Sequence, residues 1–310
     1  MPSLNSLRAF EAAARHLSYT RAAEELSVTT AAISHQIKAL EEYLDITLVK
    51  RNGRGIALTD AGRACLPALS DGFARLAEAV DVIRSRTGSG PLTIRATSSF
   101  ASKWLVPRLD RFTTPHTEID VRVSASRRPV DFSHEDVDLA IIYGDGQRED
   151  VHLDLLMRNE VFPVCTPKLL EGPHPLNEPA DLRFHHLLHH DSPNPDDTAP
   201  DWGTWLKAAG VADQVQVRGP HFDRAALVID ECVAGHGVGL ARSSLVADDL
   251  RAGRLVRPFS LSIPVKFAYY LVMPSYKVRL PKVAAFREWI LAEAKSYRET
   301  ELASLPPAVR

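Results

Sequence analysis

Four polar side chains near the amino terminus have a spacing that could serve recognition chemistry. Thr30, Ser34 and Lys38 are four residues apart, so they share one face of any helix that contains them, and His35 lies beside that face. Hydroxyl, imidazole and ammonium groups in such a row can hydrogen-bond to base edges in the major groove of DNA. A solvated polar helix face has the same composition, so the elements that carry these residues must decide between the two.

The polar row falls on a helix that we predict over residues 30–44, with Thr29 as its N-cap. A shorter helix at 19–26, capped by Ser18, precedes it and is joined to it by about three residues. Two helices joined by so short a turn, the second with a polar row, predict a helix-turn-helix. The opposite face of the second helix carries apolar residues at helical spacing, which are Ile33, Ile37, Leu40 and Leu44.

Two short strands are predicted after these helices, at 48–51 and 56–58, joined by a tight turn. Lys50, Arg51 and Arg54 place three positive charges at its tip, where a winged helix meets phosphates or a minor groove. A helical bundle with a solvated charged face is the alternative, but the order of capped helix, two-faced helix and basic hairpin favours the winged helix-turn-helix. The predicted DNA contacts are Thr29, Thr30, Ala31, Ser34, His35, Lys38, Arg51 and Arg54.

A long helix is predicted over residues 60–86, after an N-cap at Thr59. Its apolar residues from Leu66 onward recur at spacings of three and four, the heptad seam of helices that pair between chains. Pro67 lies in the first turns, where a proline costs about 3 kcal/mol or kinks the helix, so we rely on the seam from Leu69. A long helix lying on its own domain is the alternative. The predicted dimerisation residues are Leu69, Phe73, Leu76, Val80 and Ile83.

The pattern of residues changes after a break at 87–91 (TGSGP), a stretch rich in glycine that ends in proline. Beyond it, short β-rich runs alternate with amphipathic stretches, which predicts an α/β architecture with largely parallel sheets. Roughly 220 residues are more than one small sheet requires, so two lobes are expected. Strands are predicted at 92–97, 119–125, 137–143, 161–166, 215–219, 238–241 and 267–273, and helices at 101–113, 202–210, 224–235, 243–252 and 281–297.

The composition is that of an ordinary globular protein, with 45% hydrophobic and 25% charged residues, and 37 basic against 39 acidic residues give a net charge of −2. That balance does not indicate nucleic-acid binding. If part of the chain binds DNA, the local placement of charge must reveal it. No apolar run approaches the roughly 18 residues of a membrane span, and the amino terminus lacks a secretory pattern. Cys65, Cys165 and Cys232 form no CxxC pair, which fits a cytoplasmic protein.

Two motifs point weakly to other chemistry. Neighbouring histidines suggest a metal site, but on a strand His185 and His189 lie on one face and the histidine after each on the other, so no metal is predicted. Residues 235–239 (GHGVG) are similar to a dinucleotide loop, but they follow a helix and precede a strand, the reverse of the required order. The hydrolase motifs GxSxG and HExxH are absent, and no cofactor or catalytic residue is predicted.

Longer stretches resemble the N-terminal domain of LysR-type transcriptional regulators, namely residues 4–10 (LNSLRAF), 21–26 (RAAEEL), 32–41 (AISHQIKALE) and 58–62 (LTDAG). Residues 99–109 (SFASKWLVPRL) and 285–290 (AFREWI) are similar to the subfamily of glycine-cleavage activators and β-lactamase-inducing regulators. The resemblance covers essentially the whole chain. It implies a winged helix-turn-helix, a dimerising linker helix, an effector domain folded like periplasmic solute-binding proteins, and assembly as a homodimer or homotetramer. Many members carry Gln followed by Pro or Ala where this chain has Thr30 and Ala31, so we expect different operator bases.

The resemblance and the elements together predict an N-terminal all-α winged helix-turn-helix with a linker helix, and a C-terminal α/β effector domain of two lobes. Residues 1–62 would form the DNA-binding domain, 63–90 the dimerising helix and hinge, and 91–310 the effector domain. Lobe I is expected at about 91–161 and 267–297, and lobe II at about 162–266.

In two-lobed α/β folds ligands bind at the carboxyl ends of strands. Ser98 and Ser99 begin a predicted helix whose free N–H groups could hold a carboxylate. The resemblance implies that the cleft uses this loop, although each such residue could also serve an ordinary turn. The predicted effector-binding residues are Ser98, Ser99, Phe100, Ser126, Tyr143, Thr166 and Phe222.

The charges near these loops indicate the effector's chemistry. Arg127 and Arg128 would attract an anion, while Asp145 and Asp223 would hold an amino group. We therefore expect an amino acid or a short peptide rather than an apolar aromatic compound. At the predicted helix start, residues 223–225, relatives often carry a small hydroxyl residue that this chain lacks.

The function that these features favour is sequence-specific regulation of transcription under the control of a small effector. Its expected partners are double-stranded DNA with a pseudo-palindromic operator, the effector and a second copy of the chain, with RNA polymerase as a further candidate. The alternative is a stand-alone solute-binding protein or an enzyme on the same α/β fold, with residues 1–86 as a helical appendage. Such an appendage would need neither a basic wing nor a heptad seam.

Overall fold

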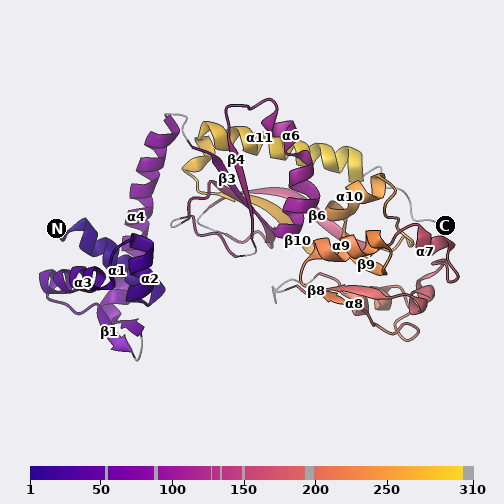
Figure 1. Cartoon of the computed structure of the whole chain (residues 1–310), viewed down its shortest axis with the longest axis horizontal. Helices are drawn as coiled ribbons and strands as arrows, with labels where there is room; N and C mark the ends of the chain where they lie inside the picture. Colours follow the sequence, from indigo (N-terminus) through magenta and orange to yellow (C-terminus); the bar gives the residue numbers. More distant parts are fainter. Residues whose placement is uncertain are drawn as a thin grey trace. The chain divides into compact units, whose positions relative to one another are not determined.

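The computed structural model describes residues 1–52, 55–86, 90–126, 128–132, 135–148, 151–192 and 199–302. The chain divides into two compact units, Met1–Ser89 and Gly90–Arg310, which we call unit 1 and unit 2 (Figure 1). The elements of unit 1 are α1 (Leu4–His16), α2 (Tyr19–Leu26), α3 (Thr30–Leu44), β1 (Val49–Asn52), β2 (Gly55–Leu58) and α4 (Asp60–Arg86).

Helices α1, α2 and α3 pack closely because α1 and α2 present alanines to one another. Phe10 is fully buried at the centre of this core, and Ala22 and Ala23 on α2 are buried beside it. The predicted caps are confirmed: Ser18 Oγ accepts from the Arg21 N–H, and Thr29 Oγ1 accepts from the Ala32 N–H. Each of the three helices ends at a residue in the left-handed conformation, namely Leu17, Ser27 and Asp45.

The β1–β2 hairpin is antiparallel, with Val49 opposite Leu58. Thr59 then caps α4 through a 3.1 Å hydrogen bond that its Oγ1 accepts from the Gly62 N–H. Gly62 is required here because a Cβ atom would lie 2.4 Å from the Leu48 carbonyl oxygen. Helix α4 continues through Pro67 without a break, and its first turns lie against α1 and the wing.

Unit 2 is built on one mixed sheet of eight strands in the part of the chain that the structure describes, in the order β4-β3-β5-β10-β6-β9-β7-β8. The two longest strands, β6 and β10, run antiparallel at its centre and carry the chain between the two halves of the unit. The strands are β3 (Leu92–Ala96), β4 (Val121–Ala125), β5 (Leu139–Gly144), β6 (His152–Val164), β7 (Leu187–His190), β8 (His221–Phe222), β9 (Val238–Arg242) and β10 (Ile263–Met273).

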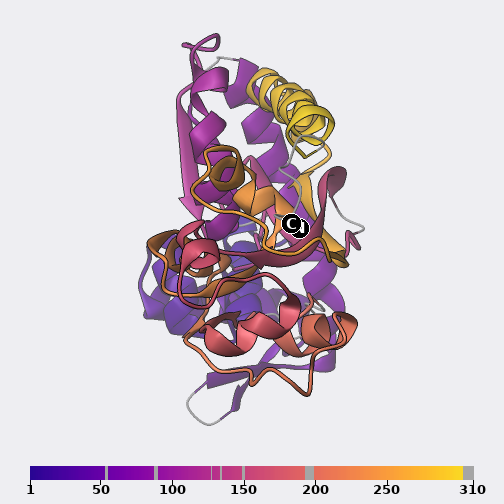
Figure 2. The ribbon, with the colours of Figure 1, turned by 90° about the vertical axis from the view of Figure 1, so that its right-hand side faces the viewer.

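Helices cover both halves of this sheet. In Figures 1 and 2, α11 (yellow) lies beside the β3–β5 half, which we call lobe I, and α8 lies with the β7–β9 half, which we call lobe II. Phe112 of α6 packs edge-on against Phe286 of α11 over lobe I. The helical segments are α5 (Ser98–Phe100), η1 (Ala101–Leu105), η2 (Val106–Arg108), α6 (Asp110–Thr113), α7 (Lys168–Glu171), η3 (Pro179–Phe184), α8 (Trp202–Ala208), α9 (Ala225–Ala234), α10 (Ser243–Arg251), η4 (Lys277–Arg279), α11 (Pro281–Ser296) and η5 (Tyr297–Leu302).

Two expectations about unit 2 were wrong. The sheet is mixed rather than largely parallel, because the returning strand β10 inserts between β5 and β6 and runs antiparallel to both. The run at 215–219 is not a strand, although Arg218 accepts a hydrogen bond from the Leu187 N–H through its carbonyl. Pro220 has no N–H to donate to a ladder, and pairing with β7 begins only at His221.

Candidate DNA interface and candidate effector cavity

Helix α3 presents its polar row to solvent. The opposite face is fixed in the core by Ile33, Ile37 and Leu40, each 1% exposed, so the helix cannot rotate without exposing them. Leu44 was predicted to face inward and is 40% exposed instead, because the last turn of α3 extends past the edge of the core. The exposed residues of the cap and the helix include every one predicted to contact DNA, namely Thr29, Thr30, Ala31, Ser34, His35 and Lys38.

A carboxylate that the sequence did not single out ties the wing to α3. Glu41 Oε1 accepts hydrogen bonds from the backbone N–H groups of Leu48 at 2.7 Å and Val49 at 3.0 Å. The first strand of the wing is thereby held at the end of the recognition helix, so that the two present a joint surface. Among the basic residues of the wing, Lys50 is exposed, whereas the side chain of Arg51 and all of Arg54 lie outside the described residues.

The predicted seam on α4 begins inside unit 1. Leu66 and Leu69 pack against the core of the three helices, so Leu69 is partly used within its own chain. Phe73 is half-buried, and Leu76 is 51% exposed. The last two seam residues, Val80 and Ile83, lie on the helix, but their side chains are outside the described set.

A cavity of about 690 Å³ lies in unit 2 where β7 ends and α9 begins. This volume is within the range of small-molecule sites in proteins. Apolar side chains and eight polar ones share the lining, which comprises Val161, Leu188, His189, His190, Asp191, Ser192, Ala199, Pro200, Asp201, Trp202, Thr204, His221, Ala225, Leu240 and Arg242.

Arg242, the last residue of β9, gives the cavity a permanent positive charge. It is 8% exposed, and its guanidinium carbon lies 4.1 Å from the centre of the Tyr143 ring. Because Tyr143 belongs to β5, this cation–π contact joins lobe II to lobe I. A guanidinium group keeps its charge when buried and matches the geometry of a carboxylate or a phosphate.

Imidazole and carboxylate groups line another part of the cavity. The rings of His189 and His221 stack with their centres 4.2 Å apart, and His221 Nδ1 lies 3.0 Å from an Asp191 oxygen. Burial lowers the pKa of His189, and the neighbouring His221 lowers it further. Asp201 caps α8, and its hydrogen bonds from Thr204 lower the pKa of its carboxyl group.

Three residues predicted for the effector site adjoin this cavity without lining it. Ser99 Oγ accepts a 3.1 Å hydrogen bond from the Ala226 N–H at the start of α9, which leaves the hydroxyl hydrogen free to donate. Tyr143 contacts Arg242, as described above, and Phe222 follows the lining residue His221.

The other predicted residues lie apart from the lining. Phe100 is fully buried between Trp104 and Tyr269, where its ring fills the core of lobe I. Ser126 Oγ accepts from the Arg128 N–H within its own loop, and Thr166 is 7% exposed. Ser98 is half-buried, Arg128, Asp145 and Asp223 are exposed, and Arg127 lies outside the described residues.

Sequence reasoning missed several residues that line the cavity, although the sequence contained an indication of Arg242. Arg242 follows directly after the predicted strand 238–241, so the strand-end argument applies to it as well as to Tyr143. The histidine run at 185–190 supplies two further polar lining residues, His189 and His190. No group of three or more histidine, cysteine or acidic side chains arranged for a metal occurs among the residues that the structure describes.

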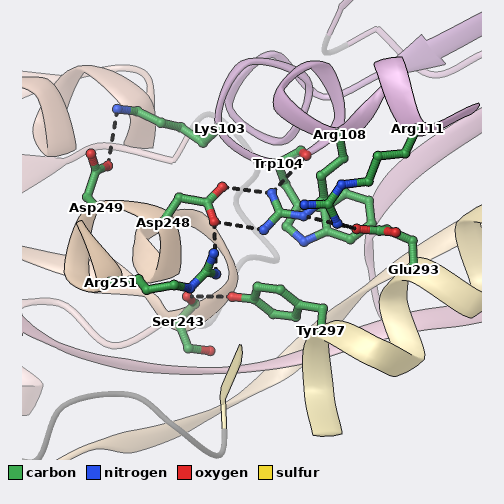
Figure 3. Close-up of polar contacts among 10 residues, drawn as sticks. All are labelled: Lys103, Trp104, Arg108, Arg111, Ser243, Asp248, Asp249, Arg251, Glu293 and Tyr297. Atoms are coloured by element: carbon green, nitrogen blue, oxygen red, sulfur yellow. Dashed lines mark hydrogen bonds and ion pairs between the residues drawn. The ribbon is translucent and has the colours of Figure 1, made fainter. Parts of the chain in front are cut away.

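The segment from Ser99 to Arg108 is held against lobe II by ion pairs (Figure 3). Arg108 is 2% exposed and donates to both carboxylate oxygens of Asp248 on α10, at 2.7 and 2.8 Å. Lys103 donates to Asp230 on α9 at 2.7 Å. The same helix α10 starts directly after Arg242, so these contacts fix both the Ser99 loop and the cationic wall of the cavity.

A helix-turn-helix with an exposed polar row and a second unit with a polar cavity define a ligand-responsive DNA-binding protein. Residues 4–63 match the model of the bacterial regulatory helix-turn-helix proteins of the lysR family, and residues 85–295 match the LysR substrate binding domain. The chain belongs to the LysR family of transcriptional regulators, as its sequence motifs predicted. The predicted fold class and the class of function are confirmed with it.

Named relatives share most of their length with this chain. The glycine cleavage system transcriptional activator of Escherichia coli K12 is 42% identical over 96% of both chains. The HTH-type transcriptional activator AmpR of Citrobacter koseri is 35% identical over 94% of this chain and 98% of that protein. Both belong to the subfamily that the sequence resembled.

Solved structures agree with the architecture. The effector domain of the transcriptional regulator AmpR of Pseudomonas aeruginosa aligns with a TM-score of 0.56 at 29% identity, covering 69% of this chain and all of that one. CrgA, a LysR-type transcriptional regulator from Neisseria meningitidis, aligns over 95% of this chain and 99% of its own with a TM-score of 0.52. At 18% identity the second match supports the fold alone. No helix among the described residues is both long and apolar enough to cross a membrane.

Proposed function

We propose that α3 reads the bases of a pseudo-palindromic operator while the wing contacts the flanking backbone or minor groove. The observation that carries this proposal is the division of α3 into a buried apolar face and an exposed polar face. Ser34 and Lys38 would lie in the major groove, with Arg51 and Arg54 of the wing outside it. The full set of proposed contacts is Thr29, Thr30, Ala31, Ser34, His35, Lys38, Arg51 and Arg54.

The proposed effector is a small zwitterion, such as an amino acid or a short peptide, bound in the cavity of unit 2. Arg242 would hold its carboxylate, because this side chain is buried, permanently charged and part of the lining. Asp191 and Asp201 supply the negative charge that an amino group requires. Ser99 and Tyr143 would complete the site from the side of lobe I.

The proposed effector site is centred on other charged residues than those that the sequence indicated. Ser98, Phe100, Ser126, Thr166 and Phe222 remain proposed as residues around the cleft. Arg242 takes the place of Arg127 and Arg128 as the proposed partner of the carboxylate. Asp191 and Asp201 take the place of Asp145 and Asp223 as proposed partners of the amino group.

We further propose that the chain acts as a homodimer, or as a tetramer built from dimers, through the α4 seam. Leu76 supports this assignment, since a large apolar side chain is 51% exposed at a seam position. The names of the relatives support activation of transcription, for which RNA polymerase is the partner to test. We also propose that the chain works in the cytoplasm and is not an enzyme.

Selection of bound sequences from a random duplex library tests the DNA function. The full chain should enrich two inverted half-sites, and its affinity should fall steeply with salt. A solute-binding protein or an enzyme with a helical appendage would enrich no sequence.

A thermal-shift screen of the full chain with glycine, L-alanine, dialanine and neutral aromatic compounds tests the effector class. A zwitterion should stabilise the chain. Stabilisation by the aromatic compounds alone would contradict it.

A further inference from the structure

Helix α1 contains a buried carboxylate that neither the core nor the DNA surface explains. Glu11 is 3% exposed and stands among the buried residues Phe10, Ala12 and Ala13. Removing a carboxylate from water is unfavourable unless hydrogen bonds or opposite charges compensate for it. A side chain in this position therefore needs partners, and their location indicates what it does.

Two partners of Glu11 come from different helices. Ser70 Oγ on α4 donates to Glu11 Oε1 at 2.9 Å, and Arg15 Nε on α1 donates to the same oxygen at 3.2 Å. Arg15 in turn donates to both carboxylate oxygens of Glu25 at the end of α2, at 2.7 and 2.9 Å. This series of hydrogen bonds, from Glu25 through Arg15 and Glu11 to Ser70, links α2, α1 and α4.

Ser70 occupies the place where α4 leaves the three-helix core. Leu66 and Leu69 pack against that core, whereas Asp71 and Leu76 beyond them are exposed. In Figure 1 the rest of α4 extends away from α1, α2 and α3. Apolar contacts such as those of Leu66 tolerate sliding and tilting, but a hydrogen bond is sensitive to both distance and angle.

We infer that the hydrogen bond between Ser70 and Glu11 fixes the direction in which α4 leaves the DNA-binding unit, and through it the spacing of the two half-sites. Both are positioning residues that do not touch DNA. The inference rests on the proposed pairing of α4 between two chains. The part of α4 beyond Ser70 runs to Arg86 and is about 24 Å long, so a tilt of about 10° moves its far end by about 4 Å, which is roughly one base pair.

Selection from a random duplex library with the full chain tests this inference. The variants are Ser70→Ala, which leaves Glu11 paired with Arg15, Ser70→Thr, which keeps the hydroxyl donor, and Asp71→Ala as an exposed control on the same helix. The wild type, Ser70→Thr and Asp71→Ala should enrich one spacing. Ser70→Ala should enrich the same half-site bases at spacings that differ by one or two base pairs, and should bind the wild-type spacing several-fold more weakly.

A single unchanged spacing in Ser70→Ala overturns the inference, and so does a change of half-site bases at constant spacing. If the wild type enriches no paired half-sites, the proposed function fails, and a measurement without DNA then decides about the helix direction.

That measurement is the distance between spin labels on Glu24→Cys and Ala79→Cys, two exposed positions of unit 1, in a Cys65→Ala background diluted with unlabelled chain. Ser70→Ala should broaden the distance distribution within one protomer, and Ser70→Thr should restore it. An unchanged distribution in Ser70→Ala overturns the inference, whatever the DNA selection shows.

Discussion

Arg242 and Tyr143 come from different lobes of unit 2 and form a cation–π contact, in which the guanidinium carbon lies 4.1 Å from the centre of the aromatic ring. One side of this guanidinium group is occupied by the ring, and the residue also lines the 690 Å³ cavity. A ligand carboxylate bound to Arg242 would therefore bind a residue of β9 that is itself in contact with β5. If the cavity holds the effector as proposed, this contact would link its occupancy to the relative position of the lobes.

Replacing Arg242 by Met should weaken binding of a zwitterionic ligand by about 10- to 100-fold, since a charge-assisted hydrogen bond contributes about 1.5–3 kcal/mol. Isothermal titration of the full chain with the compound that stabilises the wild type measures this. Arg251→Met is the matched control, because its side chain is 50% exposed and lies on α10, outside the cavity lining. Equal affinity of Arg242→Met and wild type would remove Arg242 from the site.

The pair of His189 and His221 should make unit 2 sensitive to acid. Burial and the neighbouring His221 lower the folded-state pKa of His189 below its usual value near 6.5. The unfolded chain then binds more protons, so this residue's contribution to stability is present above pH 6.5 and decreases as the pH falls below it. His189→Gln should flatten the dependence of the unfolding midpoint on pH in this window.

Denaturant unfolding at several pH values measures this slope. His236→Gln is the control, since that ring is largely exposed. The interpretation is wrong if His189→Gln and wild type have the same slope, or if the ring of His189 titrates above pH 6.5 by nuclear magnetic resonance.

Asp248→Asn should destabilise unit 2 by about 3 kcal/mol, because it removes the charge of the bidentate partner of the buried Arg108, and Glu293, 3.6 Å from Arg108 Nε, compensates that charge only in part. Arg251→Ala removes only the exposed partner of the same carboxylate and should cost less than about 1 kcal/mol. Chemical denaturation of the two variants compares them directly. Similar losses in both would show that the Arg108 pair does not hold the segment against α10.

Leu76→Lys should disrupt the dimer and abolish operator binding while unit 2 stays folded. A lysine placed in a paired apolar seam buries an uncompensated charge, at a cost of at least a few kcal/mol. Sedimentation velocity measures the assembly, and circular dichroism checks the fold. Arg75→Glu, one residue away and outside the seam, should leave the dimer intact. A Leu76→Lys dimer that still binds DNA would place the interface elsewhere.

The winged helix could be predicted from the sequence because local rules determine it. Thr29 caps α3 by bonding to the N–H of Ala32, only three residues away. Helical periodicity alone places Ile33 on the buried face of α3 and Ser34 on the exposed face. Leu44 shows the limit of the rule: periodicity gives the face of a residue but not how far the core extends along the helix.

The cavity could not be predicted in the same way, because its walls come from segments far apart in the sequence. Arg242 is held under Tyr143, a residue about a hundred positions earlier, and His221 stacks on His189 across two short strands. Phe100 shows the same limit. The resemblance placed it in the effector loop, and only the structure shows that its ring packs with Trp104 and Tyr269 in the core.

The most direct test of the account compares the sequences selected by the wild type and by Ser34→Ala from one random duplex library. We predict that both enrich paired, inverted half-sites and that Ser34→Ala changes the preferred base at one position in each of them, because Ser34 lies exposed on the face of α3 proposed to enter the major groove. Glu118→Ala, an exposed change in unit 2, should select the wild-type sequence. Identical preferences for wild type and Ser34→Ala, or no enrichment by the wild type, would contradict the proposed DNA interface.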